Sequence, residues 1–335
     1  MRGFQIRAET GFLIQEYIMK LRMHARPIVA IVAFAFGALP KVGAQDRNPK
    51  KSRLVWAAKP VTPTPYEPPN RLIWRLSEIL AAHKGQASWR QPVVKTRDFE
   101  AEWVSMAPGE KTKTVFYADD RVFWVVESGQ MRVNIEGQQP FVAKKGFLVQ
   151  TAPRLAYSME TIGNEPVLRF EVRPAGEMPS YPIDETPTPV KGWTFIQTRI
   201  TDTGSYDQDN KPYLDFWKDV VEANAGSSNF VWDGHTAAHI IRGKGVATPT
   251  ETDLGHFHEN MVELWIVLEG QLDFLIEGEP LVTGTVGDVI QAPNERWHRE
   301  TSRAPGTATR LAITPRNKEG QVHYYRPDAA GGDNQ

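Results

Sequence analysis

The sequence predicts an all-β chain made of two similar domains in tandem, with a short helix before each. Between residues 229 and 314, short runs rich in β-branched and aromatic residues are separated by glycine and proline turns, which is typical of a barrel or sandwich. Residues 123–137 (FWVVESGQMRVNIEG) also lie over residues 264–278 (LWIVLEGQLDFLIEG) with a constant offset of 141 residues. A repeat with so long a period indicates two related domains rather than a solenoid.

Composition excludes several classes of function. The chain has 335 residues, a length that suits about two domains, and a net charge of −1 with no basic block, so we expect no nucleic-acid partner. It contains no cysteine, which excludes disulfides, thiolate catalysis and iron–sulfur clusters. The expected partner is a small-molecule substrate, and a homo-oligomer is compatible with the composition.

Residues 1–44 are predicted to be a signal peptide. Basic residues between positions 20 and 26 precede the uncharged apolar run Pro27–Leu39, and small residues follow as far as Ala44. We expect cleavage after about Ala44, a periplasmic or secreted mature protein, and no membrane span after cleavage. The run is short for a span, although a membrane anchor or a buried helix is the alternative. Translation could begin at any of three methionines: Met1, Met19 or Met23.

The remaining chain divides by composition and periodicity. Residues 45–70 are polar and then proline-rich, as in an extended arm or linker, and 71–83 show helical spacing of apolar residues. A second helix is predicted over 212–225. The predicted divisions are an N-terminal domain at 71–173, a linker at 174–190, a C-terminal domain at 191–326 and a disordered tail at 327–335. The strands predicted in the C-terminal domain are 229–232, 237–242, 254–258, 262–268, 271–277, 288–291, 297–301 and 308–314.

Four side chains in the C-terminal domain predict a metal site. His256 and His258 alternate, so on a strand their rings point to the same face, and Glu263 begins the next strand. His298 follows much later, behind a glycine and a proline turn. Three imidazoles and one carboxylate from three strands suit a borderline divalent metal.

The spacing of these residues resembles a known family. The orders His-x-His-x4-Glu-x6-Gly (256–270) and Gly-x5-Pro-x4-His (287–298) are similar to the two signature motifs of the cupins. One departure is Glu295, where the second motif usually has glycine. The resemblance implies a small jelly-roll β-barrel with the metal inside it. Because the pattern is repeated, the chain resembles a bicupin, with two such barrels in tandem.

The first copy lacks these ligands. Val115, Tyr117 and Val122 match His256, His258 and Glu263 at the constant offset, and Ser158 matches His298 if one residue is inserted before Pro153. We therefore expect a metal-free N-terminal barrel with a structural role, in which the two barrels bury apolar faces against each other. Binding of a small ligand without metal is the alternative.

Four more residues are candidates for substrate binding. Trp265 shares a face with Glu263 and could be either a wall for the substrate or a core residue. His239 could support a metal ligand or lie at a polar surface. Arg296 and Arg242 could each hold a carboxylate through paired N–H groups.

The resemblance implies one divalent transition metal per chain, with iron or manganese first and nickel, copper or zinc as further options. Glu263 would be a ligand and could also act as a base. The expected function is that of an exported metal-dependent enzyme, a dioxygenase-type oxidoreductase acting on a small oxygenated or aromatic acid. Alternatives are a non-catalytic metal-containing protein that binds or senses a small molecule, a sugar isomerase-like enzyme, and an oxalate decarboxylase-like lyase.

Overall fold

A computed structural model describes residues 54–250, 252–316 and 322–326, and Val55 onward belongs to one compact unit. The predicted signal peptide (1–44), the beginning of the predicted arm (45–53) and the predicted tail (327–335) lie outside these residues. No helix in the described part of the chain has the length and apolar character to cross a membrane.

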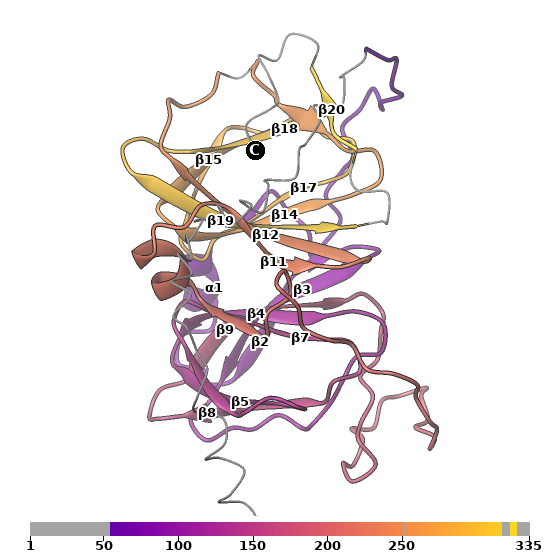
Figure 1. Ribbon diagram of the computed structural model, residues 1–335. Helices are drawn as coiled ribbons and strands as arrows, with labels where there is room; N and C mark the ends of the chain where they lie inside the picture. The colour runs from indigo at the N-terminus through magenta and orange to yellow at the C-terminus, as the bar shows by residue number, and fades with distance from the viewer. Residues whose placement is uncertain (1–53, 251, 317–321, 327–335) are drawn as a thin grey trace, which may run out of the picture. The chain divides into compact units, whose positions relative to one another are not determined.

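The prediction of an all-β chain with two tandem barrels is confirmed (Figure 1). The first barrel packs a sheet in the order β7-β4-β9-β3-β2 over a sheet in the order β6-β5-β8. Its strands are β2 (Trp89–Lys95), β3 (Phe99–Met106), β4 (Val122–Ser128), β5 (Gln130–Ile135), β6 (Phe141–Lys144), β7 (Phe147–Thr151), β8 (Tyr157–Ile162) and β9 (Val167–Pro174).

The second barrel repeats this arrangement. One sheet has the order β17-β14-β19-β12-β11 and the other β16-β15-β18-β13-β20. Its strands are β11 (Ser228–Trp232), β12 (Thr236–Lys244), β13 (His256–Phe257), β14 (Glu263–Glu269), β15 (Gln271–Ile276), β16 (Val282–Thr285), β17 (Val289–Ala292), β18 (His298–Ser302), β19 (Thr307–Pro315) and β20 (Tyr324–Tyr325). Each strand predicted in this domain is present, and 254–258 shortens to β13.

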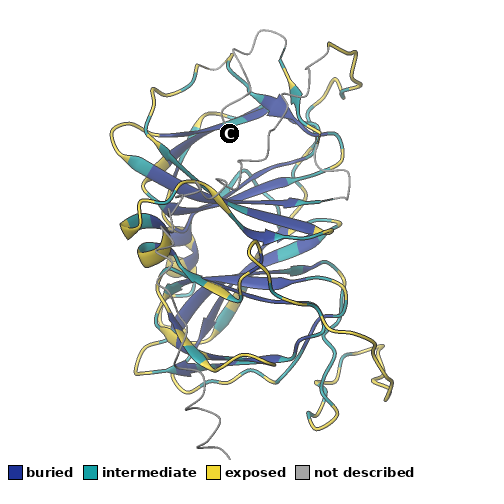
Figure 2. Ribbon diagram, viewed as in Figure 1, coloured by how far each residue is buried: buried dark blue, intermediate teal, exposed yellow. Residues whose placement is uncertain are grey.

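Strand β14 shows how the sequence builds two cores. Its residues are almost all buried, as expected for a strand covered on both faces (Figure 2). Leu264 and Ile266 join a cluster that contains side chains of both barrels, including Phe123 and Phe230, whereas Trp265 and Val267 fill the interior of the second barrel. The apolar faces of the two barrels therefore pack against each other.

The segments that precede the barrels are exchanged between them. Strand β1 (Ile73–Trp74), before the first barrel, pairs with β17 of the second, and β10 (Tyr213–Asp215), before the second barrel, pairs with β7 of the first. A Cβ atom at Gly146 would collide with the ring of Trp217, and one at Gly287 would collide with the side chain of Leu76. Glycine at these repeated positions admits the exchanged segments.

Both predicted helices are shorter than expected. The predicted helix over 71–83 is only α1 (Leu76–Ala82), because residues 73–74 extend to pair with the second barrel. The helix predicted over 212–225 is strand β10 followed by a π-helix, η1 (Trp217–Glu222), for the same reason. The spacing of apolar residues predicts an amphipathic segment, but it does not predict the strand pairing that shortens the helix.

The register of the repeat corrects one sequence assignment. Tyr157 pairs with Ile135 in the first barrel, and His298 pairs with Ile276 in the second, so Tyr157 and not Ser158 is the counterpart of His298. The offset of 141 residues is therefore unbroken through this region. The proline of the turn lies one position later in the first copy than the offset predicts, and no residue is inserted into the strand.

Candidate metal centre

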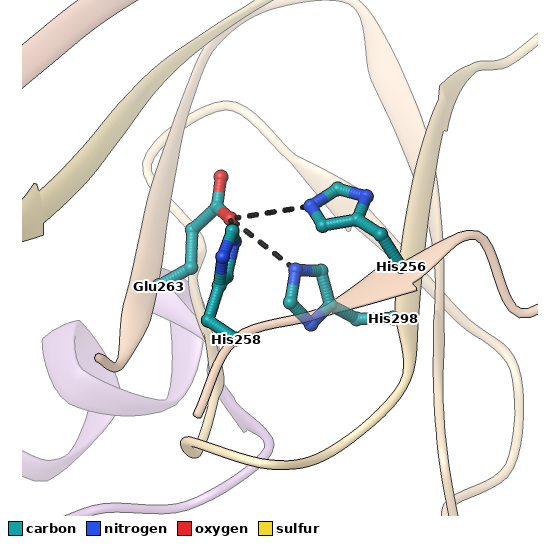
Figure 3. A group of neighbouring side chains, drawn as sticks. All are labelled: His256, His258, Glu263 and His298. Atoms are coloured by element: carbon teal, nitrogen blue, oxygen red, sulfur yellow. Dashed lines mark hydrogen bonds and ion pairs between the residues drawn. The ribbon is translucent and has the colours of Figure 1, made fainter. Parts of the chain in front are cut away.

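The four predicted ligands converge inside the second barrel (Figure 3). One ligand atom from each of His256, His258, Glu263 and His298 lies within 4.8 Å of the other three, and all four residues are buried. Oxygen Oε2 of Glu263 is 3.2 Å from Nε2 of His258, 3.2 Å from Nε2 of His298 and 3.9 Å from Nε2 of His256. Three imidazoles thus surround one carboxylate oxygen.

Strand pairing positions these side chains. His256 and His298 stand directly opposite each other on β13 and β18, so their rings share one face of the sheet. His258 follows β13, and Glu263 begins β14 in the opposing sheet. The barrel therefore brings together residues that are 42 positions apart in the sequence.

The outer nitrogens of two rings fix which nitrogen faces inward. Nδ1 of His258 lies 2.9 Å from the carbonyl oxygen of Val322, and Nδ1 of His298 lies 2.9 Å from that of Arg296. Because a carbonyl oxygen only accepts, Nδ1 of each ring carries a proton, and Nε2 of each ring faces Glu263. Nε2 of His256 is buried and has no hydrogen-bond partner among the described residues.

Electrostatics make this a site for a cation. Burial and the neighbouring His298 lower the pKa of His256 to about 2, so this ring is neutral. Burial alone would raise the pKa of Glu263, but hydrogen bonds from His258 and His298 hold it well below its usual range. Burial would lower the pKa of His298, yet the bond to Glu263 raises it. Positive charge must balance the buried carboxylate, and three ring nitrogens with one carboxylate oxygen form a donor set that fits a divalent metal.

Trp265 holds the carboxylate in place. Its side chain is 0% exposed, and its Nε1–H donates to Oε1 of Glu263 at 3.0 Å. This bond leaves Oε2 to face the histidines. Trp265 is therefore a buried residue of the barrel core that positions a ligand.

Three predicted substrate-binding residues lie elsewhere. The guanidinium of Arg296 donates to the carbonyl oxygens of Thr64 and Glu277 and pairs with Glu279, so it holds residues 55–70 against the second barrel. Arg242 pairs with Glu269, at the opposite end of β14 from Glu263.

His239 packs its ring edge to face on Trp232, with ring centroids 4.8 Å apart. The prediction for these three residues rests on residue type alone. Their partners belong to strand ends and to the arm, which spacing in the sequence does not reveal.

A residue that the sequence analysis missed lies beside the cluster. The ring of His323 is centred 4.8 Å from that of His256 and 4.5 Å from that of His258, and Tyr325 is 5.3 Å from His256. His323 is half-buried and Tyr325 is exposed, so the two rings border the side of the cluster nearest solvent. The alternation of His323 and Tyr325 at the start of the short strand β20 (Tyr324–Tyr325) is the available signal in the sequence.

Comparison with known proteins places the fold. No family model matches the sequence, and no curated protein matches it. Salicylate 1,2-dioxygenase from Pseudaminobacter salicylatoxidans superposes with a TM-score of 0.51 at 13% identity, covering 72% of this chain and 82% of its own. A single-site mutant of that enzyme in complex with gentisate gives a TM-score of 0.52 at 11% identity, covering 72% and 80%.

The protein is a bicupin in fold. A cupin 2 conserved barrel domain protein from Leptotrichia buccalis also aligns, at 13% identity and a TM-score of 0.46 over 73% of this chain and 96% of its own. At such low identity the likeness to the two salicylate dioxygenase structures shows a shared fold alone and leaves the chemistry of this chain to its own residues.

Proposed function

We propose that this bicupin is a metal-dependent enzyme, a dioxygenase-type oxidoreductase that acts on a small oxygenated or aromatic acid. The observation that carries the proposal is the convergence of three imidazole nitrogens on one buried carboxylate oxygen beside a half-buried histidine. Divalent iron, or manganese, would supply a Lewis acid that polarises a bound carboxylate or phenolate and, as iron, a centre that reacts with dioxygen.

The chain's own residues have three tasks in this proposal. His256, His258, Glu263 and His298 would hold the metal, each through one ligand atom. The low pKa of Glu263 keeps it an anionic ligand, which favours that role over the role of a base. His323, on the side nearest solvent, is placed to donate a hydrogen bond to an oxygen of the substrate.

A non-catalytic metal-binding protein is the second candidate, and the position of His323 is the observation that favours it. A fifth ligand from His323 would help to close the coordination sphere, as in a structural site. The variant His323→Ala separates the two functions. In an enzyme this variant keeps the metal and loses turnover, whereas in a binding protein it loses metal affinity.

The direct test measures oxygen uptake by protein reconstituted with iron or manganese, supplied with salicylate, gentisate and short hydroxy acids. We expect uptake with at least one acid, lost in His298→Ala and kept in His235→Ala, whose exposed side chain lies outside the cluster. No uptake by fully loaded protein with any of these acids would contradict the proposal. Export of the enzyme remains a prediction from residues 1–44.

A further inference from the structure

The interior of the first barrel contains a cavity of about 700 Å³. It is lined by residues of β3, β8 and β9 together with residues 179–188 of the segment that leaves β9. Its volume falls within the range of roughly 300–1,000 Å³ typical of small-molecule sites. This barrel therefore has room for a ligand at the level where the second barrel gathers its metal ligands.

Two tyrosines replace two of those ligands. Tyr117 and Tyr157 stand at the positions of His258 and His298, and both line the cavity. Burial raises the pKa of Tyr117 to about 12 and also raises that of Tyr157, so both phenols keep their protons. Within the described chain, neither hydroxyl makes a hydrogen bond with another residue, which leaves two donor–acceptor groups facing the cavity.

An ion pair also lines the same cavity. Nε and Nη2 of Arg169 donate to Oε2 of Glu171 at 3.1 and 2.9 Å, and the side chain of Arg169 is 0% exposed. Nη1 of Arg169 faces the sulfur of Met106 at 2.9 Å, a weak acceptor for a charged donor. Burial would raise the pKa of Glu171, but Arg169 and Arg90 lower it, so the carboxylate is ionised. The cavity thus offers a charged donor and a charged acceptor that already balance each other.

We propose that the first barrel binds a small neutral molecule with several hydroxyl groups, a polyol or a sugar, without a metal. A hydroxyl can accept from Arg169 or a tyrosine and donate to a carboxylate, so it satisfies both kinds of group at once. An added anion would meet the buried carboxylates of Glu171 and Glu102, and an added cation would meet Arg169 and Arg90. The other cations of the lining also have partners: Lys111 pairs with Glu160, Arg173 pairs with Glu100, and Lys113 donates to the carbonyl oxygen of Thr186. Trp89 and Tyr181 also line the cavity, and aromatic rings suit the apolar faces of a sugar ring.

The test is a titration of the full chain with glucose, xylose, mannitol and glycerol, and with benzoate and succinate as anions. Binding is measured by calorimetry and ligand-observed NMR. We expect at least one polyol to bind with a Kd of about 1 mM or tighter. Tyr117→Phe and Tyr157→Phe should each weaken binding about three- to tenfold through loss of one hydrogen bond. Tyr213→Phe, a change on β10 outside the cavity, should leave binding unchanged.

Absence of binding by every polyol in folded protein would overturn the proposal, as would stronger binding of the anions. Binding that is unchanged in both tyrosine variants would also overturn it, because the ligand would then lie elsewhere. His298→Ala removes a metal ligand of the second barrel and should leave polyol binding intact. This result separates the cavity from the metal centre, so either proposal can fail alone.

Discussion

Replacing Trp265 by phenylalanine should weaken metal binding although the residue touches no metal. The change removes the 3.0 Å bond from the indole to Oε1 of Glu263 and leaves that buried oxygen without a donor. A hydrogen bond to a charged group contributes about 1.5–3 kcal/mol. Loss of a bond that orients a metal ligand typically lowers metal affinity about 10- to 100-fold. We expect a fall in metal affinity of that size.

The first barrel supplies a matched control. Trp124 is the counterpart of Trp265, is also 0% exposed, and donates to the buried Glu171 at 2.7 Å. Trp124→Phe therefore removes a similar volume and a similar hydrogen bond in the barrel without the cluster. Both variants should unfold at lower temperature, and only Trp265→Phe should lose metal in a competition with a chelator. Equal metal affinity in folded Trp265→Phe and wild type would refute this reasoning.

Three further changes test other parts of the structure. His258→Ala should abolish metal binding and leave the circular dichroism spectrum unchanged. Unfolding of this variant would instead show that the metal site is structural. Gly287→Ala should lower the free energy of unfolding by more than about 1 kcal/mol in denaturant titrations, because φ is +83° and the added Cβ would collide with Leu76. An unchanged free energy of unfolding would show that β1 and α1 can detach from the second barrel. Arg310→Met leaves the carboxylate of Glu300 buried without its partner, so the free energy of unfolding in the same titration should fall by about 3–5 kcal/mol. A fall of less than about 1 kcal/mol would mean that water reaches the pair.

The sequence was sufficient for the fold and for the residues that form the cluster. Alternation of His256 and His258 on one face and the long separation from His298 required a barrel to bring them together, and strands β13 and β18 do so. The repeat predicted two barrels because an offset that holds through strands and turns can arise only from two copies of one architecture.

Other features depended on contacts that the sequence does not record. The exchange of β1 and β10 between barrels involves main-chain hydrogen bonds, which any residue can make. Arg296 binds a distant arm rather than a substrate, and residue type alone cannot separate these roles. Aligning the two turns on their prolines makes Ser158 the counterpart of His298. The register of β8 shows that the counterpart is Tyr157.

Elemental analysis of protein purified without chelators or a histidine tag tests the central claim most directly. We predict about one iron or manganese per chain, absent from His298→Ala, because the described residues bring metal-ligating side chains together only in the second barrel. Two metals per chain would contradict the assignment of tyrosine and valine at the matching positions of the first barrel. Protein that takes up no metal even after reconstitution would contradict the metal centre itself.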